Sequence, residues 1–532
     1  MATGLGRRQF LGGAAATAVG LVVLRAPGAL AAPPVSPRVA YGPDSARSMR
    51  LAWSTPASVS GLRAEIGLDD RLGRPLPVDT QTAAGHGVRY HHVLADGLQP
   101  ATTYHYRMAH DGGSTTGTFT TAPAEAVPFS FVAFGDQGDG ATAAAVGGTI
   151  GRIRPDLVFL VGDLSYASKT GGLVPGGILP PTVDHGIWDR WLGLVSGAGG
   201  SGVPWLAGVG NHEIEDGQGD LGYDGYLARV PLPGNGPTDV PTAWTARHGN
   251  VAFVNLDAND VSYEITRNLG WTGGAQTRWL ESTLRSLRAD ALIDWIVVGF
   301  HHCAYCTNVV HGSDGGVRAA WGHLFDQYEV DLVVNGHNHC YERAHPMRAG
   351  APVAEVASGA TWDSSKGTTY LTAGGGGQAA YPTFLPEVSY VSTTALGLRV
   401  PELAPWSAFT DPGNSIVAVD VTPPASDGAT RLALRVVSST GAVLERLTLV
   451  RHRATAQAAV PSRVASGAGT SPTAAAPPPD RVSDPPIERG RLPKTGRDDR
   501  LRLLAGAAAG AGALIGRQLL RDPTEGDVRT SG

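Results

Sequence analysis

The sequence predicts two folded domains in series, an N-terminal all-β sandwich and then a layered α/β domain with mixed sheets. Two observations indicate this order. Short stretches of alternating apolar and polar residues, separated by turn-forming clusters, occupy residues 35–122. From about residue 126 the pattern changes to fully apolar runs that alternate with longer segments of helical periodicity. The 532 residues are enough for two or more domains with sizeable cores.

The composition excludes some classes of function. The formal net charge is -5 and 17% of the residues are charged, which argues against a nucleic-acid surface and against a basic membrane-binding face. The 72 glycines and 38 prolines indicate extensive loops and linkers. Three cysteines are too few for a disulfide scaffold.

Residues 1–31 have the pattern of a signal peptide. Arg7 and Arg8 precede an apolar segment that extends to Leu24, and Ala29–Ala31 has the small residues of a cleavage site. The arginine pair resembles a twin-arginine signal, which exports proteins that have already folded. An ordinary secretory signal is the alternative. In either case we expect an exported protein.

The segment 35–122 is predicted to be the β-sandwich. MRLAWS (49–54), LRAEIG (62–67) and TYHYRMA (103–109) alternate with period two, and turn clusters separate them. The segment LADGLQPATTYHYRM resembles the fibronectin type III pattern, in which Leu and Pro precede a Tyr-x-Tyr strand. No cluster of ligand-type side chains occurs here, so we expect a structural or docking role.

The segment 126–452 is predicted to be the α/β domain. WLESTLRSLRA (279–289) has helical periodicity, and three later stretches resemble antiparallel strands that complete the domain. Five apolar strands are expected, at 129–134, 157–161, 204–209, 294–300 and 330–335.

Each of these five strands is followed by residues of the types that bind metals. We expect the strands to lie in one sheet, so that their carboxyl ends meet at one rim, where such folds bind ligands. The residues in question are Asp136 after the first strand, Asp163 and Tyr166 after the second, Asn211 and His212 after the third, His301 and His302 after the fourth, and His337 and His339 after the fifth.

The residue types are suited to two metal ions. Carboxylates and a phenolate favour a hard ion such as Fe(III), whereas imidazoles and an amide oxygen suit Zn(II), Mn(II) or Fe(II). His337 and His339 are two residues apart, so in an extended segment their side chains share a face about 6.6 Å apart. Two such imidazoles can bind two different ions about 3.5–4 Å apart.

The motif set GDxG, GDxxY, GNHE, VxxH and GHxHxYER resembles that of the purple acid phosphatases, a family of calcineurin-like metallophosphoesterases. The resemblance covers roughly residues 35–452, because plant-type members also carry a fibronectin-like N-terminal domain. It implies a metallophosphoesterase domain with a βαβαβ metal-binding core. The tyrosine of GDxxY distinguishes this family from most other members of the superfamily.

The resemblance also implies a role for each residue. Asp136, Tyr166 and His339 would hold Fe(III), Asp163 would bridge the two ions, and Asn211, His301 and His337 would hold a divalent Zn, Mn or Fe ion. The VxxH spacing from Val298 favours His301 over its neighbour His302. His212 matches a substrate-binding or proton-donating histidine, and His311 falls where the family places another.

The expected activity is that of an exported acid phosphatase. A small phosphate monoester would bind near both cations, and metal-activated hydroxide would attack phosphorus while His212, together with His311, stabilises the phosphoryl oxygens or protonates the leaving group. The sequence contains neither a GxSxG elbow nor a GxxxxGK[ST] loop. A phosphodiesterase or nucleotide pyrophosphatase on the same core remains an alternative, as does a wall-displayed binding protein with a decayed site.

Residues 453–532 predict that the exported protein is either attached to the cell wall or secreted. Residues 453–490 are rich in Ala, Pro and Ser and are expected to be a disordered linker. Within 491–532, LPKTG (492–496) and an apolar run at 503–516 resemble a sortase sorting signal, although acidic residues follow where a short basic end is usual. Sortase is therefore an expected partner. The uncharged run is short for a membrane span.

Two further features have plain interpretations. Cys303, Cys306 and Cys340 adjoin predicted ligands, and we expect buried thiols or one disulfide, with a separate zinc or redox site as the alternative. Gly374–Gly377 is expected to form a tight or flexible turn and not a phosphate-binding loop.

Overall fold

The structure is a computed structural model that describes residues 35–168, 171, 183–394 and 398–452. The predicted signal peptide (1–31), linker (453–490) and sorting signal (491–532) lie outside the described residues. No helix in the described ranges is long and apolar enough to cross a membrane.

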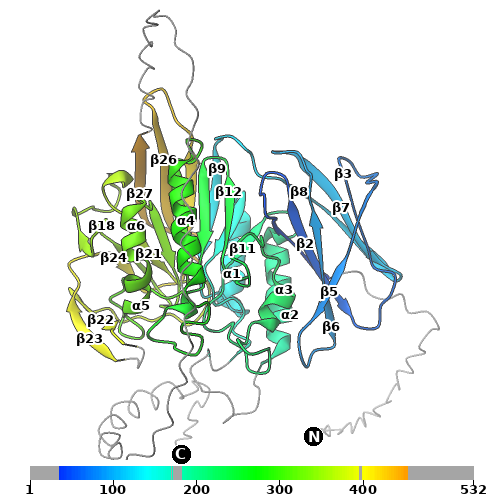
Figure 1. Ribbon diagram of the computed structural model, residues 1–532, viewed down its shortest axis with the longest axis horizontal. Coiled ribbons are helices and arrows are strands. Elements are labelled where there is room, and N and C mark those ends of the chain that lie inside the picture. The colour runs from blue at the N-terminus through cyan, green and yellow to red at the C-terminus, as the bar shows by residue number, and fades with distance from the viewer. Residues whose placement is uncertain (1–34, 169–170, 172–182, 395–397, 453–532) are drawn as a thin grey trace, which may run out of the picture. The chain divides into compact units, whose positions relative to one another are not determined.

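The N-terminal domain consists of two antiparallel four-stranded sheets (Figure 1). The predicted strands at 49–54, 62–67 and 103–109 correspond to β2, β3 and β7. Alternate residues of β7, Tyr104, Tyr106 and Met108, are buried, as the period-two pattern predicts. In spatial order the sheets are β1 (Val35–Tyr41), β2 (Met49–Pro56), β6 (Val88–Ala95) and β5 (Asp79–Thr82), and β4 (Arg74–Leu76), β3 (Arg63–Gly67), β7 (Thr103–His110) and β8 (Gly113–Thr120).

The second domain is built on two seven-stranded mixed sheets. The first contains β11 (Trp205–Ala207), β10 (Leu157–Leu160), β9 (Phe129–Phe134), β25 (Ser415–Thr422), β26 (Ala429–Ser438), β27 (Val443–His452) and β20 (Thr361–Asp363). The second contains β12 (Trp244–His248), β13 (Val251–Asn255), β14 (Trp295–Gly299), β16 (Leu332–Asn335), β21 (Thr369–Ala373), β17 (Tyr341–Ala344) and β24 (Ser407–Asp411). The three C-terminal strands are antiparallel, as predicted, and β25 pairs with β9.

The expectation that the five ligand-bearing strands share one sheet is wrong. β9, β10 and β11 lie in the first sheet, whereas β14 and β16 lie in the second. The sheets pack face to face. The rings of Phe131 and Phe159, from the first sheet, lie 5.1 and 5.5 Å from the ring of Phe253, from the second sheet. A strand that is apolar on both faces can be covered by a helix on one side and by a second sheet on the other. The apolar pattern alone does not distinguish this arrangement from a single sheet.

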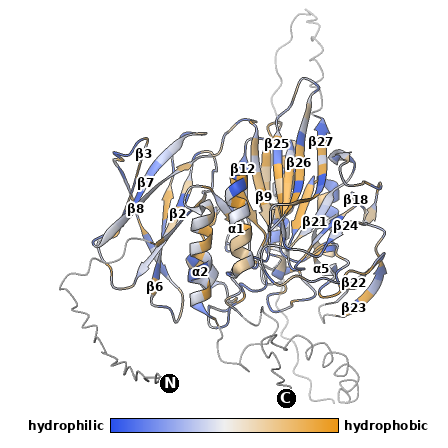
Figure 2. Ribbon diagram, turned by 180° about the vertical axis from the view of Figure 1, so that it is seen from behind, coloured by the Kyte–Doolittle hydropathy of each residue, from blue (hydrophilic) through white to orange (hydrophobic). Residues whose placement is uncertain are grey.

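Helices cover the outer faces of the two sheets, giving four layers. α1 (Ala141–Ile153) and α2 (His185–Val195) pack on the first sheet, and α4 (Ala275–Ala289) and α6 (His323–Gln327) pack on the second. Figures 1 and 2 view opposite sides, and α4 and α6 are in front in Figure 1 whereas α1 and α2 are in front in Figure 2. The predicted helix at 279–289 is the last part of α4.

Smaller elements complete the described fold. They are the helices α3 (Asp224–Arg229) and α5 (Gly315–Val317), the short 3-10 or π-helical segments Ser196–Gly200, Ala258–Asp260, Arg318–Gly322 and Ser364–Lys366, the sheet of β15 (Ser313–Asp314), β22 (Val388–Ser392) and β23 (Arg399–Leu403), and the pair β18 (Met347–Arg348) and β19 (Ala351–Pro352).

Candidate metal centre

The carboxyl ends of the strands in both sheets meet, and the loops that follow them bring the predicted ligands together. Asp136 follows β9, and Asp163 and Tyr166 follow β10 in the first sheet. His301 follows β14, and His337 and His339 follow β16 in the second sheet. The site therefore lies between two sheets and not at the rim of one.

A first cluster joins a phenol, a carboxylate and an imidazole. The Tyr166 hydroxyl lies 2.9 Å from Asp136 Oδ1 and 2.9 Å from His339 Nε2. His339 Nε2 is 3.5 Å from Asp136 Oδ1. His339 Nδ1 donates to the carbonyl oxygen of Ala379 at 2.9 Å, so its Nε2 carries the lone pair that faces the cluster. Three donor atoms at these separations are spaced as ligands of one ion are.

A second cluster contains two imidazoles and a carboxylate. His301 Nε2 lies 3.2 Å from Asp163 Oδ2 and 3.3 Å from His337 Nδ1. His301 Nδ1 faces the carbonyl oxygen of Val161 at 3.2 Å, which again leaves Nε2 free to bind a metal.

Asn211 provides the test of whether the residues fit a metal. Its Nδ2 donates to the carbonyl oxygen of Gly171 at 3.0 Å, and its buried Oδ1 has no hydrogen-bond partner among the described residues. A buried oxygen without a partner costs free energy unless an ion or water satisfies it. Amide oxygens, imidazoles and carboxylates are donor types that divalent cations accept, so the residues fit the expected metal.

Asp163 connects the two clusters. A ligand atom of Asp163 lies within 4.8 Å of one on Asp136 and one on His301, so it is close to a member of each cluster. Its Oδ1 accepts from the backbone N–H of His212 at 2.8 Å, which fixes the orientation of the carboxylate. This is the position that a bridging ligand requires.

The loops hold several of these residues in left-handed backbone conformations. The φ angles are 63° at Asp136, 51° at Asp163, 61° at Tyr166 and 70° at His337. A non-glycine residue in this region costs on the order of 1–2 kcal/mol, and such strain accumulates at functional sites. The stabilisation of the surrounding fold offsets it, and the sharp turns direct the side chains to the strand ends.

Two glycines permit the close approach of the loops. A Cβ atom at Gly210 would lie 2.1 Å from Asp163 Oδ1, and one at Gly336 would lie 2.5 Å from Asp136 Oδ2. Neither carboxylate could hold its position beside a larger residue. The glycines of the GNHE and GHxH motifs are therefore required by packing against the donors.

The electrostatics of the site favour cations. Burial alone would lower the pKa of His301, but the negative charges of Asp163 and Asp136 raise it to about 10. Burial, and then the charge of Asp163, raise the pKa of Asp136 to about 7. Burial and the neighbouring carboxylates raise the pKa of the Tyr166 phenol well above its usual value. A bound metal ion would replace the proton on His301 and would stabilise the ionised forms of Asp136 and Tyr166.

The two predicted catalytic histidines lie at the accessible edge of this centre. The side chains of His212 and His311 are 22% and 19% exposed, whereas that of Asp163 is 2% exposed. His212 Nδ1 donates to the carbonyl oxygen of Ser168 at 2.8 Å, and its ring lies 4.3 Å from that of Tyr166. His212 Nε2 is therefore the nitrogen available to a substrate.

His302 is buried next to the centre without facing a donor atom. Its ring centroid is 4.5 Å from that of His337, and neither of its nitrogens has a hydrogen-bond partner in the described ranges. His301 and not His302 faces Asp163, and the assignment of His301 as the metal ligand stays a prediction.

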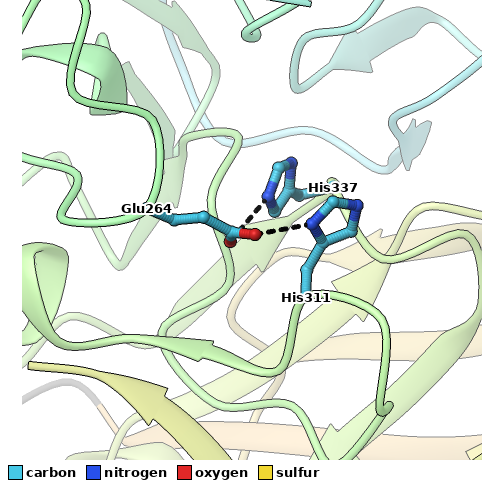
Figure 3. Close-up of side chains that lie close together, drawn as sticks. All are labelled: Glu264, His311 and His337. Atoms are coloured by element: carbon cyan, nitrogen blue, oxygen red, sulfur yellow. Dashed lines mark hydrogen bonds and ion pairs between the residues drawn. The ribbon is translucent and has the colours of Figure 1, made fainter. Parts of the chain in front are cut away.

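Sequence reasoning missed two carboxylates that support the loops. Glu213 accepts from the backbone N–H groups of Asp163, Leu164 and Gly210 at 2.9, 2.8 and 2.7 Å. Glu264 lies between the imidazoles of His311 and His337 (Figure 3). Glu213 was visible in GNHE as a carboxylate after a strand. Glu264 belongs to no motif and follows β13, a strand that the sequence reading omitted although its first four residues, VAFV, are apolar.

The remaining sequence features are structural. Cys303, Cys306 and Cys340 are buried and unbonded, and Cys303 Sγ donates to the carbonyl oxygen of Gly336 at 2.8 Å. A Cβ atom at Gly374 would lie 2.2 Å from the carbonyl oxygen of Asn338, so this glycine run packs tightly behind the centre.

Profiles of known families match both domains. Residues 34–121 match the family described as "Purple acid Phosphatase, N-terminal domain", and residues 130–341 match "Calcineurin-like phosphoesterase". An uncharacterised protein of Mycobacterium tuberculosis is 32% identical over 524 residues, which cover 85% of this chain and 97% of that protein.

Plant enzymes are more distant relatives. A phosphoenolpyruvate phosphatase of Allium cepa is 28% identical over 54% of this chain and 57% of its own. The Fe(3+)-Zn(2+) purple acid phosphatase 12 of Arabidopsis thaliana is 25% identical over 58% of this chain and 65% of its own. The purple acid phosphatase PPD1 of yellow lupin has a similar fold, with a TM-score of 0.62 and 22% identity over 79% of this chain and 75% of its own.

The stacked sheets, the strand-end loops and the buried donor clusters define a metallophosphoesterase of the calcineurin-like class. Within this class, the match of the N-terminal domain and the similarity to plant enzymes indicate one family. The chain belongs to the purple acid phosphatase family.

Proposed function

We propose that this protein hydrolyses phosphate monoesters at a dinuclear centre of Fe(III) and a divalent Zn, Mn or Fe ion. The observation that carries the proposal is the pair of adjoining donor clusters, one built on Tyr166 and the other on two imidazoles, with Asp163 between them. The hard oxygen donors of the first cluster suit Fe(III), and the softer set suits a divalent ion.

The metal and the protein have separate roles in this proposal. Two bound cations supply charge neutralisation at the phosphoryl group and a water molecule of lowered pKa. Asp136, Tyr166 and His339 would hold the ferric ion, Asn211, His301 and His337 the divalent one, and Asp163 both.

His212 is proposed to act directly on the substrate. Because the Ser168 carbonyl oxygen accepts from Nδ1, the nitrogen of His212 that can take up a further proton is Nε2, which lies 4.0 Å from Asp163 Oδ2. A protonated Nε2 can donate to a phosphoryl oxygen or to the leaving alkoxide. Burial lowers the pKa of His212, and the charge of Asp163 opposes that effect. His311 is the second group proposed for this task.

The relatives support a monoesterase. One is named for phosphoenolpyruvate, which is a phosphate monoester, and another for an Fe(3+)-Zn(2+) centre. The decisive experiment combines metal analysis of the purified protein with kcat/KM values for an aryl monoester, the matching diester and a nucleoside triphosphate. We expect about one iron and one divalent ion per chain, a visible absorption band, and a monoester preference of tenfold or more, about 1.4 kcal/mol. A colourless protein with two zinc ions, or a preference for diesters, would contradict the proposal.

We also propose that the enzyme acts outside the cytoplasm, attached to the cell wall by a sortase. The signal-like residues 1–31 and the LPKTG sequence at 492–496 support this location. Cell fractionation tests it, because release of intact protein by salt or detergent would exclude a covalent link.

A further inference from the structure

Three histidines are predicted metal ligands, and their outer nitrogens have different partners. The nitrogens of His301 and His339 that point away from the donor clusters face backbone carbonyl oxygens, those of Val161 and Ala379. The outer nitrogen of His337 instead faces a side chain, with Nε2 3.1 Å from Oε2 of Glu264. Every residue has a backbone carbonyl oxygen, so the contacts of His301 and His339 do not depend on the side chains at positions 161 and 379. The contact of His337 with a carboxylate exists only if the side chain at position 264 carries one.

The same carboxylate holds a second imidazole. His311 Nδ1 lies 2.8 Å from Glu264 Oε1, and Figure 3 shows the carboxylate between the two rings. The ring centroids of His311 and His337 are 4.0 Å apart. Glu264 thus joins one predicted metal ligand to one predicted catalytic group.

The contacts determine where each histidine carries its proton. A carboxylate only accepts hydrogen bonds, so the nitrogen that faces Glu264 must be protonated in both rings. This leaves Nδ1 of His337 as the lone pair that faces His301 Nε2 at 3.3 Å, inside the second cluster. In His311 it leaves Nε2 free. Carboxylates that orient ligand histidines in this way raise the basicity of the ligand and fix its ring.

Glu264 is itself held firmly. Its side chain is 11% exposed, and Arg399 of β23 donates to Oε1 through Nη2 and to the carbonyl oxygen of Val310 through Nη1. Its backbone N–H donates to Ser262 Oγ at 3.1 Å and to Asp314 Oδ2 at 3.2 Å. The Coulomb attraction of Arg399 offsets the cost of burying the carboxylate.

We propose that Glu264 is a positioning residue that prepares His337 to bind the divalent ion and orients His311 toward the substrate. The inference rests on the proposed dinuclear site, and it adds a residue that lies outside the ligand motifs. Glu264 is not a ligand of that ion, because the imidazole ring of His337 separates it from the second cluster. In the part of the chain that the structure describes, no hydrogen bond or ion pair joins Glu264 to Asp136, Tyr166 or His339, so we expect the ferric cluster to be independent of it.

The first test measures metal affinity and does not depend on turnover. In E264L, which lacks any acceptor, we expect the Zn(II) dissociation constant from chelator competition to rise about 10–100-fold. E264Q keeps one acceptor oxygen and the size of the side chain, so its dissociation constant should lie between those of E264L and the wild type. Iron content should remain at the wild-type level in both variants.

The matched control is E402Q on the same strand as Arg399. Glu402 accepts from Arg318 at 2.7 and 2.8 Å, so this variant removes a carboxylate–arginine pair without touching any histidine of the site. We expect its Zn(II) affinity to equal that of the wild type. An unchanged affinity in folded E264L and E264Q, or an equal loss in E402Q, would overturn the proposal. If the wild-type protein binds Zn(II) tightly but hydrolyses no phosphate ester, the proposed function fails and this inference stands.

The second test concerns His311 and uses a double-mutant cycle on kcat. If Glu264 acts through His311 as well, E264L should lower kcat less in an H311A background than in the wild type, when both are saturated with metal. Equal effects in the two backgrounds would remove the His311 part of the proposal.

Discussion

Buried histidines in two regions of this protein differ in what they face. In the metal centre His301 faces Asp163 and Asp136, and its pKa is raised to about 10 against the effect of burial. Between the sandwich and the α/β domain, His92 Nε2 donates to the carbonyl oxygen of Ala228 at 2.9 Å. There His248 Nδ1 lies 2.7 Å from the Tyr41 hydroxyl.

His92 and His248, between the domains, differ from His301 in electrostatic character. Burial lowers the pKa of both His92 and His248 to about 4. Burial by itself therefore keeps a histidine neutral, as it also does at His339, whose pKa it lowers to about 4, and carboxylates are needed to make a buried position that attracts a cation. The carboxylates therefore distinguish the metal centre more clearly than its histidines do.

Removing the shared carboxylate should have the largest effect. In Asp163→Ala we expect kcat/KM for a phosphate monoester to fall by at least about 10³-fold, because the two clusters lose their common ligand. Bound metal should fall below one ion per chain, measured by elemental analysis of the purified variant. Asp139→Ala is the control, since Asp139 lies in the same region but pairs with the exposed Arg190. Near-normal turnover in Asp163→Ala would refute the bridging role.

Removing one hydroxyl from the first cluster should change the environment of the iron and leave the divalent ion in place. Tyr166→Phe keeps the ring packed against His212 and removes the contacts to Asp136 and His339. We expect the visible phenolate-to-iron band to disappear while the divalent ion remains, as measured by absorption spectroscopy with elemental analysis. Tyr381→Phe is the control, because its ring stacks on His339 at 4.1 Å. A band that survives in Tyr166→Phe would show that another residue is the phenolate ligand.

The sequence predicted several side chains that the structure brings close together, for a physical reason. Each donor lies a few residues after a buried strand, so its position depends on a short loop whose glycines are visible in the sequence, such as Gly210 and Gly336. The structure brings these residues together, and their roles as ligands stay predictions. The division into two sheets could not be predicted, because β9 and β14 have the same apolar pattern in either arrangement.

Glu264 could not be predicted from the sequence because its position depends on tertiary structure. It lies in the long segment between β13 and α4, and Asp314 and Arg399, far along the chain, hold it in place. A carboxylate in a segment without a motif has no feature that separates it from any exposed glutamate. The path of the segment, which packing determines, is what places it between two imidazoles.

The smallest expected effect is a pH dependence of stability that arises from His92, between the domains. The folded-state pKa of His92, about 4, lies below the unfolded value of about 6.5. The unfolded chain therefore binds more protons in this window, and stability should be complete above pH 6.5 and decrease as the pH falls toward 4. The loss attributable to His92 should be about 2–3 kcal/mol in the free energy of unfolding, measured by urea denaturation at pH 7.5 and pH 4.5.

His92→Gln keeps a donor for the Ala228 carbonyl oxygen but cannot be protonated, so its stability should depend less on pH across this window. His105→Gln on β7 is the control and should retain the wild-type dependence. If His92→Gln loses stability in acid as steeply as the wild type, the acid sensitivity arises elsewhere, and His92 is not the neutral structural histidine that the comparison requires. A shallower dependence would show that a buried histidine facing a carbonyl oxygen stabilises the fold as a neutral donor.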